Sequence, residues 1–160
     1  YRRQRQMCIR DREKIVEPGM KVLDLGCGSG ILSIAALLLG AERAFACDID
    51  DKAVDVAYEN AALNGVDRER YAVRAGDALS NAELQKEMGT GYNVIMANIV
   101  SDVIIALAPA VRGLMKEGGR FLASGIIDSR EEEVRAALEA AGLTVEEARA
   151  SEGWVSFLCN

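Results

Sequence analysis

The sequence predicts an α/β protein in which a doubly wound, mostly parallel β-sheet carries helices on both faces. Three observations indicate this class. Short apolar runs typical of buried strands alternate along the chain with longer segments of helical periodicity. A glycine-rich segment, Gly26–Gly30, separates the first such strand from the first helix. The 160 residues suit one domain, which at this size buries a core without disulfides or metals.

The first strand, helix and second strand are bounded by turn residues. A Pro18-Gly19 turn leads into a strand over residues 21–25, whose apolar run is that of a buried strand. The apolar helix predicted at 31–39 ends at Gly40, because glycine is a common helix stop. A second strand over 44–47 ends at Asp48.

The next segment predicts a helix, a strand and a short helix. Asp50 is a suitable N-cap for a helix that stops at Asn64-Gly65. Its apolar face comprises Ala53, Val54, Ala57, Tyr58, Ala61 and Ala62. A third strand over 71–74 is followed by Gly76-Asp77, and a short helix is predicted at 82–88.

The last part of the chain predicts two further strand–helix pairs and a strand pair. The first pair is a strand at 93–97 and a helix from Ser101 or Asp102 to about Met115, which Pro109 kinks or restarts. After a turn at 117–119, the second pair is a strand at 120–124 and a helix that begins with a Ser129–Glu132 capping box and ends at 141–142. The strand pair comprises residues 143–149 and 154–159. Since no helix separates the last two strands, we expect these two strands to be antiparallel.

Composition excludes several classes of function. The absence of histidine excludes His-based triads and the common His metal sites. A net charge of −6 disfavours direct binding of nucleic acid, because phosphate contact needs a basic surface. The same acidic balance suits a basic protein substrate, or simply keeps the surface solvated. Four cysteines without a C-x-x-C pair predict reduced core thiols and no metal: Cys8, Cys27, Cys47 and Cys159.

The N-terminal segment differs from the rest of the chain. Residues 1–14 hold six basic and two acidic residues. We interpret residues 1–12 as an artefactual or truncated start, or else as a basic arm for an acidic partner, and residues 13–160 as the domain. This start is not a secretory signal, and the longest apolar run, 31–39, is too short to cross a bilayer. We therefore expect a cytoplasmic protein with no membrane contact, and no pattern indicates its oligomeric state.

The glycine segment predicts a ligand site at the carboxyl end of the sheet. Glycines let a ligand approach the backbone, and the helix start supplies N–H groups. The dinucleotide fingerprint G-x-G-x-x-G does not fit, because Ile31 or Ser33 stands where its third glycine belongs. Asp48, at the end of the second strand, can accept hydrogen bonds from both ribose hydroxyls. Asp77 is either the corresponding adenine acceptor after the third strand or a turn residue.

Three motifs resemble class I S-adenosylmethionine-dependent methyltransferases. They are Val22-Leu23-Asp24-Leu25-Gly26-Cys27-Gly28-Ser29-Gly30, Cys47-Asp48-Ile49-Asp50 and Glu59-Asn60-Ala61-Ala62-Leu63-Asn64-Gly65. Ala97-Asn98-Ile99, together with Ser124-Gly125-Ile126-Ile127 and the late Trp154, is similar to the bacterial ribosomal protein L11 methyltransferases. The resemblance runs from about Glu13 to Cys159. It implies a seven-stranded Rossmann-like sheet whose last strand is antiparallel, in agreement with the strands predicted above.

The resemblance also implies a cofactor, S-adenosylmethionine, and a set of site residues. Gly26, Gly28 and Gly30 would pass beneath the methionine part and the ribose, and Asp24, the acid two residues before Gly26, is a further cofactor-binding residue. Asp48 would hold the ribose, Ile49 would pack on the adenine, and Asp77 would lie at the adenine edge. Asn98 would face the methyl group and the incoming amine, as cofactor-binding and catalytic residue, although it could instead be a plain strand-end cap.

The implied reaction is methylation of amino groups, on lysine or at an N-terminus, of a ribosomal protein. Family members carry a separate N-terminal domain that docks the substrate and a His-Pro-Thr-Thr type loop before the catalytic domain. Here residues 1–12 stand in the place of that loop. Two alternatives stay open: a methyltransferase of a small molecule or another protein, and a cofactor-binding module that is silent without its substrate domain. A nicotinamide oxidoreductase is disfavoured by the failed fingerprint.

Overall fold

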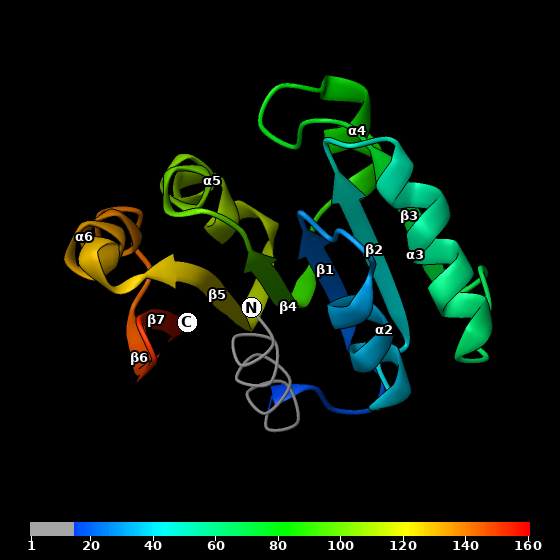
Figure 1. Cartoon of the computed structure of the whole chain (residues 1–160), viewed down its shortest axis with the longest axis horizontal. Coiled ribbons are helices and arrows are strands. Elements are labelled where there is room, and N and C mark those ends of the chain that lie inside the picture. The colour runs from blue at the N-terminus through cyan, green and yellow to red at the C-terminus, as the bar shows by residue number, and fades with distance from the viewer. Residues whose placement is uncertain (1–14) are drawn as a thin grey trace.

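The computed structural model describes residues 15–160, in which strands and helices alternate along most of the chain (Figure 1). The elements are β1 (Lys21–Leu25), α2 (Ile31–Leu38), β2 (Arg43–Asp48), α3 (Lys52–Leu63), β3 (Tyr71–Ala75), α4 (Ala82–Met88), β4 (Tyr92–Asn98), α5 (Ser101–Leu114), β5 (Met115–Ile127), the 3₁₀ helix η1 (Asp128–Arg130), α6 (Glu131–Ala140), β6 (Val145–Ser151) and β7 (Trp154–Cys159). The predicted segment 1–12 lies outside the described residues. Within residues 15–160, no helix has both the length and the apolar composition needed to cross a membrane.

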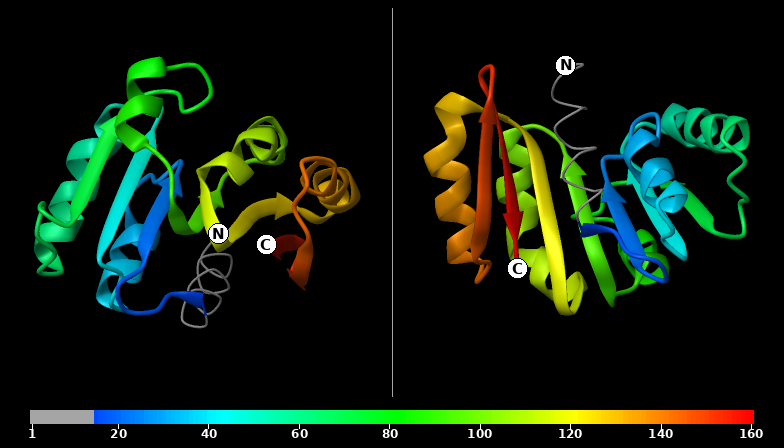
Figure 2. Two further views of the ribbon diagram at one scale, coloured as in Figure 1. Left: turned by 180° about the vertical axis from the view of Figure 1, so that it is seen from behind. Right: turned by 90° about the horizontal axis from the view of Figure 1, so that it is seen from below.

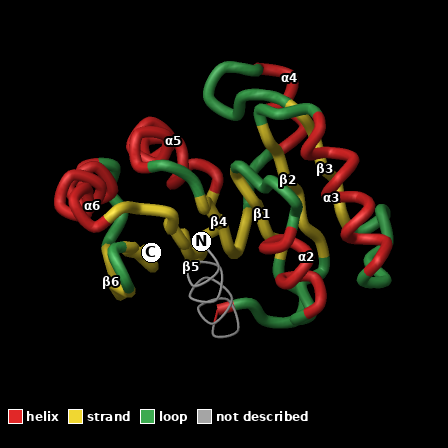
Figure 3. The backbone as a smooth tube through the Cα atoms, in the orientation of Figure 1, coloured by secondary structure: helices red, strands yellow, loops and turns green. Residues whose placement is uncertain are grey.

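Seven strands form one sheet in the order β3-β2-β1-β4-β5-β7-β6. Figure 3 shows its strands in yellow and the helices in red. Neighbouring strands from β3 to β5 are parallel, whereas β7 is antiparallel to both β5 and β6. The predicted mostly parallel, seven-stranded sheet with an antiparallel last strand is therefore confirmed. The strand order reverses beside β1, because β2 lies on one side of it and β4 on the other. At such a reversal the carboxyl ends of the strands form a crevice that binds ligands.

Helices cover both faces of the sheet, as the doubly wound prediction requires (Figure 2). α2 and α3 pack against one face, and α4, α5 and α6 pack against the other. Successive side chains of a strand point to opposite faces. In β1, Val22 therefore belongs to the core beside α2, whereas Leu23 and Leu25 belong to the core beside α5. The same alternation sends Asp24 to the α2 side.

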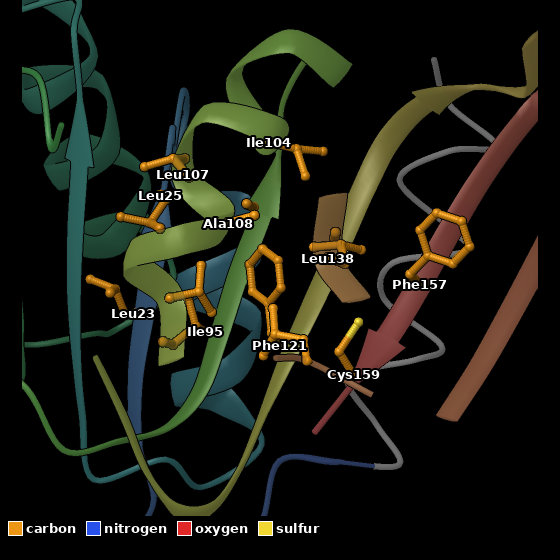
Figure 4. Packing of buried hydrophobic residues seen from close by; sticks show 14 of the residues in the cluster. Leu23, Leu25, Ile95, Ile104, Leu107, Ala108, Phe121, Leu138, Phe157 and Cys159 are labelled. Atoms are coloured by element: carbon orange, nitrogen blue, oxygen red, sulfur yellow. The ribbon is translucent and has the colours of Figure 1, made fainter. Parts of the chain in front are cut away.

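The core between the sheet and α4, α5 and α6 is the larger of the two (Figure 4). Phe121 of β5 and Phe157 of β7 are fully buried there, and Leu138 of α6 belongs to the same cluster. Burying one such side chain stabilises the fold by about 1.5–3 kcal/mol. Because β5 lies between β4 and β7, this core joins the antiparallel end of the sheet to its parallel part.

The start of α6 differs from the prediction. The capping box predicted from Ser129 and Glu132 is wrong, because η1 precedes the helix and no side chain caps its first residue. Arg130 instead donates to Glu133 Oε2 and Asp102 Oδ1, both at 2.6 Å. These ion pairs tie the beginning of α6 to the beginning of α5, which fixes the helix end without a cap.

Two boundaries in the middle of the chain also differ. The restart predicted at Pro109 is wrong, since α5 runs unbroken from Ser101 to Leu114. Pro109 lies on the exposed side of the helix, where water can solvate the carbonyl that loses its intrahelical partner. β5 begins at Met115, so the turn predicted at 117–119 falls within the strand. Gly118 adopts a φ of 77° there, and the register with β4 shifts between Tyr92 and Val94.

Candidate functional site

A pocket of about 310 Å³ opens where the carboxyl ends of β1, β2, β3 and β4 meet. The arrowheads of β1, β2 and β4 point toward this edge of the sheet (Figure 1). The pocket is lined by Leu25, Gly26, Cys47, Asp48, Ile49, Gly76, Asp77, Ala78, Leu79, Ile99, Val100, Val103 and Leu107. Four of the predicted site residues are among them: Gly26, Asp48, Ile49 and Asp77. Their separate strand ends are thus brought together in space.

The glycine loop, residues 26–30, borders this pocket at its first residue, Gly26. The N–H groups of Gly26 and Cys27 both donate to the carbonyl of Cys47, at 2.9 and 3.0 Å, which ties the loop to the end of β2. Gly26 has a φ of 72°, and a Cβ built there would lie 2.4 Å from Ile99 Cγ2. Gly28 has a φ of 52°, but a Cβ there would meet nothing within 4 Å. The loop therefore packs closely on Ile99 at Gly26 and borders open space at Gly28.

Asp48 is held in one orientation at the end of β2. Its Oδ2 accepts from the N–H of Gly28 at 2.8 Å, and its Oδ1 accepts from the N–H of Asp50 at 2.9 Å. Each carboxylate oxygen has a further lone pair, so the group can accept two more hydrogen bonds from a ligand. The carboxylate is thus suited to a vicinal diol. The bounds of α3 put its N-cap position at Asp51, one residue after the prediction, but Asp51 makes no capping hydrogen bond. The side chain that caps the helix start is that of Asp50, whose Oδ1 accepts from the N–H of Lys52 at 3.0 Å.

Asp77 and several apolar residues also line the pocket. Asp77 Oδ1 accepts from the N–H of Leu79 at 2.9 Å, which closes the turn after β3. Three pocket residues expose large apolar side chains: Ile49 is 73% exposed, Leu79 42% and Val100 65%. Such surfaces favour a flat apolar or aromatic ligand group. Sequence reasoning missed Leu79 and Val100, although both lie in the loops that follow predicted strands.

Asn98 lies at the last position of β4, beside the pocket lining rather than within it. It is half-buried and pairs with Ser124 of β5 in the sheet register. The next residue, Ile99, donates its N–H to the carbonyl of Ser124 at 3.2 Å. The β4–β5 ladder therefore continues past Asn98 and restrains its backbone. A contact between Asn98 and a substrate stays a prediction.

Asp24 lies beneath the loop and is fully buried. Its Oδ2 accepts from the N–H of Ser33 at 3.2 Å, in the first turn of α2. A carboxylate is stabilising at that end of a helix because it meets unpaired N–H groups and the positive end of the dipole. Asp24, Gly28 and Gly30 are not among the residues that line the pocket. Their direct contact with a ligand also stays a prediction.

The described cysteines are free and buried, in agreement with the prediction of reduced core thiols: Cys27, Cys47 and Cys159. Burial raises the pKa of Cys47 to about 11 and that of Cys159 to about 12, and it raises the pKa of Cys27 as well. These thiols therefore stay protonated at neutral pH and are poor nucleophiles. Cys8 lies outside the described residues. Among residues 15–160, no group of three or more Cys, Asp or Glu side chains is arranged to hold a metal ion.

Comparison with known proteins identifies the relatives of this chain. The family model described as ribosomal protein L11 methyltransferase (PrmA) matches residues 4–160. The chain is 43% identical over 155 residues to the ribosomal protein L11 methyltransferase of Agathobacter rectalis. The aligned region covers 94% of this chain and 48% of that protein. It thus spans about half the length of the curated relatives it matches.

Solved structures agree with this relationship. The ribosomal protein L11 methylase from Lactobacillus delbrueckii subsp. bulgaricus is similar with a TM-score of 0.90 at 28% identity, over 100% of this chain and 79% of that one. A magnesium protoporphyrin IX methyltransferase from Synechocystis PCC 6803, with bound SAM, has a TM-score of 0.75 at 19% identity, over 99% of this chain and 79% of that one. At this low identity, the second match shows the fold alone.

Proposed function

The chain belongs to the family of ribosomal protein L11 methyltransferases, and from this we propose that it forms the catalytic part of an S-adenosylmethionine (SAM)-dependent N-methyltransferase. Its substrate would be ribosomal protein L11, methylated on lysine side chains or the N-terminal amine in the cytoplasm. The observation that carries the proposal is the position of Asp48. One hydrogen bond, from the N–H of Gly28 to Asp48 Oδ2, joins the glycine loop to an acceptor suited to a ribose.

We assign each part of SAM to one or more of the predicted site residues. Asp48 would accept from the two ribose hydroxyls, since each of its oxygens has a lone pair to spare. The exposed side chain of Ile49 would pack on the adenine, and Asp77 would lie at the adenine edge. Gly26, Gly28 and Gly30 would run beneath the methionine part and the ribose. Asp24 would support this loop from below through its bond to the first turn of α2.

Bound SAM supplies a methyl group that is already activated by its sulfonium. The protein therefore has to orient a neutral amine and exclude water. Removing the proton at pH 7 costs roughly 4–5 kcal/mol for a lysine of pKa about 10.4, and about 1.4 kcal/mol for an α-amine of pKa about 8. We assign the orientation of the amine to Asn98. Its side-chain oxygen accepts a hydrogen bond from the amine N–H and so directs the amine lone pair toward the methyl group. Because the chain has no histidine, we propose that the proton leaves through water.

Calorimetric titration with SAM tests the cofactor site. Asp48→Ala should weaken binding at least about tenfold, because hydrogen bonds to a charged group contribute about 1.5–3 kcal/mol each. Asp67→Ala is the matched control, since Asp67 Oδ1 also accepts a backbone N–H, that of Glu69 at 3.0 Å, and does not line the pocket. It should bind SAM as the unmodified chain does. The proposed site would be refuted if the folded, unmodified chain does not bind SAM, or if Asp48→Ala binds SAM with unchanged affinity.

A transfer assay tests the reaction and separates the alternatives. Labelled SAM is offered together with ribosomal protein L11, with other basic proteins or with small amines. Label on L11 supports the proposal, whereas label only on another acceptor supports a different methyltransferase. SAM binding without any transfer supports a silent cofactor-binding module. Asn98→Ala should lose turnover even at saturating SAM, and undiminished turnover would remove Asn98 from the mechanism.

A further inference from the structure

A chain of buried hydroxyl groups lies directly beneath the glycine loop. Tyr71 Oη, from β3, is 2.6 Å from Ser33 Oγ of α2. The Ser33 hydroxyl donates to the carbonyl of Gly30 at 3.1 Å, and the Ser33 N–H donates to Asp24. Ser33 and Asp24 are fully buried, and Tyr71 is 1% exposed. None of these side chains lines the pocket, so none is placed to touch a ligand there.

The direction of this chain follows from the number of available protons. Ser33 has one hydroxyl hydrogen, which it donates to Gly30. At the contact between the two hydroxyls, Tyr71 must therefore be the donor and Ser33 the acceptor. Burial raises the pKa of Tyr71, which keeps the phenol protonated for this role. The hydrogen bonds thus run from Tyr71 through Ser33 to the carbonyl of Gly30, the last residue of the loop.

Tyr71 also supports Gly30 by direct contact. Gly30 has a φ of 79°, and a Cβ built there would lie 2.6 Å from Tyr71 Oη and 3.0 Å from the Cβ of Ala57. The phenol oxygen therefore rests close against the backbone at the point where the loop turns into α2. A second side chain holds the neighbouring carbonyl, because Asn60 donates from Nδ2 to Ser29 O at 2.9 Å. The Ser29 carbonyl is thus held by a side chain of α3, and the Gly30 carbonyl by Ser33 of α2, which is in turn bonded to Tyr71 of β3.

We propose that Tyr71 is a positioning residue for the SAM loop, acting through Ser33 and Gly30 without touching the cofactor. The inference rests on the proposed function, since it concerns how this chain binds SAM. Without the Tyr71 hydroxyl, Ser33 Oγ loses its hydrogen-bond donor. Gly30 also loses the phenol oxygen that it packs against. The loop then samples other positions, so that fewer molecules present the geometry that SAM needs.

Tyr71→Phe tests this idea because it removes one oxygen and keeps the ring. Tyr92→Phe is the matched control: Tyr92 is also 1% exposed, and its hydroxyl donates to the carbonyl of Met88 in the other core. Urea denaturation should find a similar loss of stability in both variants. In calorimetric titration, Tyr71→Phe should weaken SAM binding about three- to tenfold, the equivalent of one hydrogen bond, and Tyr92→Phe should not.

Ser33→Ala provides the second variant, because it breaks the same chain one step nearer to Gly30. It should weaken SAM binding by a similar factor, and the double variant should bind about as weakly as either single one, since both act through one carbonyl. This variant carries the test if Tyr71→Phe does not fold. Three results would overturn this inference and leave the proposed function standing. They are unchanged SAM affinity in Tyr71→Phe and Ser33→Ala, equal weakening of SAM binding by Tyr92→Phe, and additive losses of affinity in the double variant. A folded unmodified chain that does not bind SAM would overturn it together with the proposed function.

Discussion

Replacing Gly26 by alanine should destabilise the protein through one identifiable contact. The φ of 72° places an alanine in the left-handed region, which costs about 1–2 kcal/mol. The added Cβ would lie 2.4 Å from Ile99 Cγ2, well inside van der Waals contact. Forcing an extra methyl into a packed site costs about 1–3 kcal/mol more. The expected total is therefore about 2–5 kcal/mol, and the side chain of Ile99 must shift in the pocket wall.

Gly28→Ala separates the two contributions, because Gly28 has a φ of 52° but no neighbour within 4 Å of the added Cβ. Urea denaturation without ligand should place Gly26→Ala about 1–3 kcal/mol below Gly28→Ala in free energy of unfolding. This difference in free energy of unfolding should vanish when each change is made separately in an Ile99→Ala background, because that background lacks the clashing methyl. Equal destabilisation by the two variants in the unmodified background would refute the close packing of Gly26 on Ile99. So would a difference that survives the Ile99→Ala change.

Three further predictions concern stability. Burial raises the pKa of Cys47 from 9.0 to about 11, so its contribution is complete below pH 9 and is lost as the pH rises toward 11. Urea denaturation at pH 8 and pH 10.5 should show a smaller loss in Cys47→Ala, and an equal loss would contradict the assignment. Asn81→Ala should cost about 0.5–2 kcal/mol in the same assay, because Asn81 Oδ1 caps α4 by accepting from the N–H of Leu84 at 3.0 Å. Phe157→Ala should cost about 3–5 kcal/mol and lower the thermal midpoint, and a change below 1 kcal/mol would mean that the core reorganises without a cavity.

The sheet and the pocket could be predicted because their signals are local. The run over 21–25, the glycine loop and Asp48 follow one another within a short stretch of chain. Parallel strands carry their carboxyl ends to one edge, so residues after separate strands meet there. This pattern predicts Gly26, Asp48 and Asp77 at one site, and the family resemblance adds Ile49; the structure places all four at one pocket.

The rest depends on contacts between distant segments. Tyr71 and Ser33 are 38 residues apart, and neither stands in a pattern that sequence reasoning could recognise. The start of α6 depends on Asp102, which lies 28 residues before Arg130 and takes the place of a local cap. The cofactor-binding role of Asp24 follows from the family resemblance and stays a prediction. Its bond to Ser33 depends on the packing of β1 against α2: the alternation of β1 directs the carboxylate to the α2 side, where it is fully buried.

The position of β7 determines when the sheet can be completed during synthesis. Residues 154–159 are translated after every other strand described, yet they pair between β5 and β6 and not at an edge. The strands whose ends form the pocket can therefore associate while β5 still presents an unpaired edge, and unpaired edges recruit other strands. We expect the nascent chain to be most prone to aggregation in this interval. Chains that stop before Trp154 should accumulate in the insoluble fraction even though every pocket residue has been made.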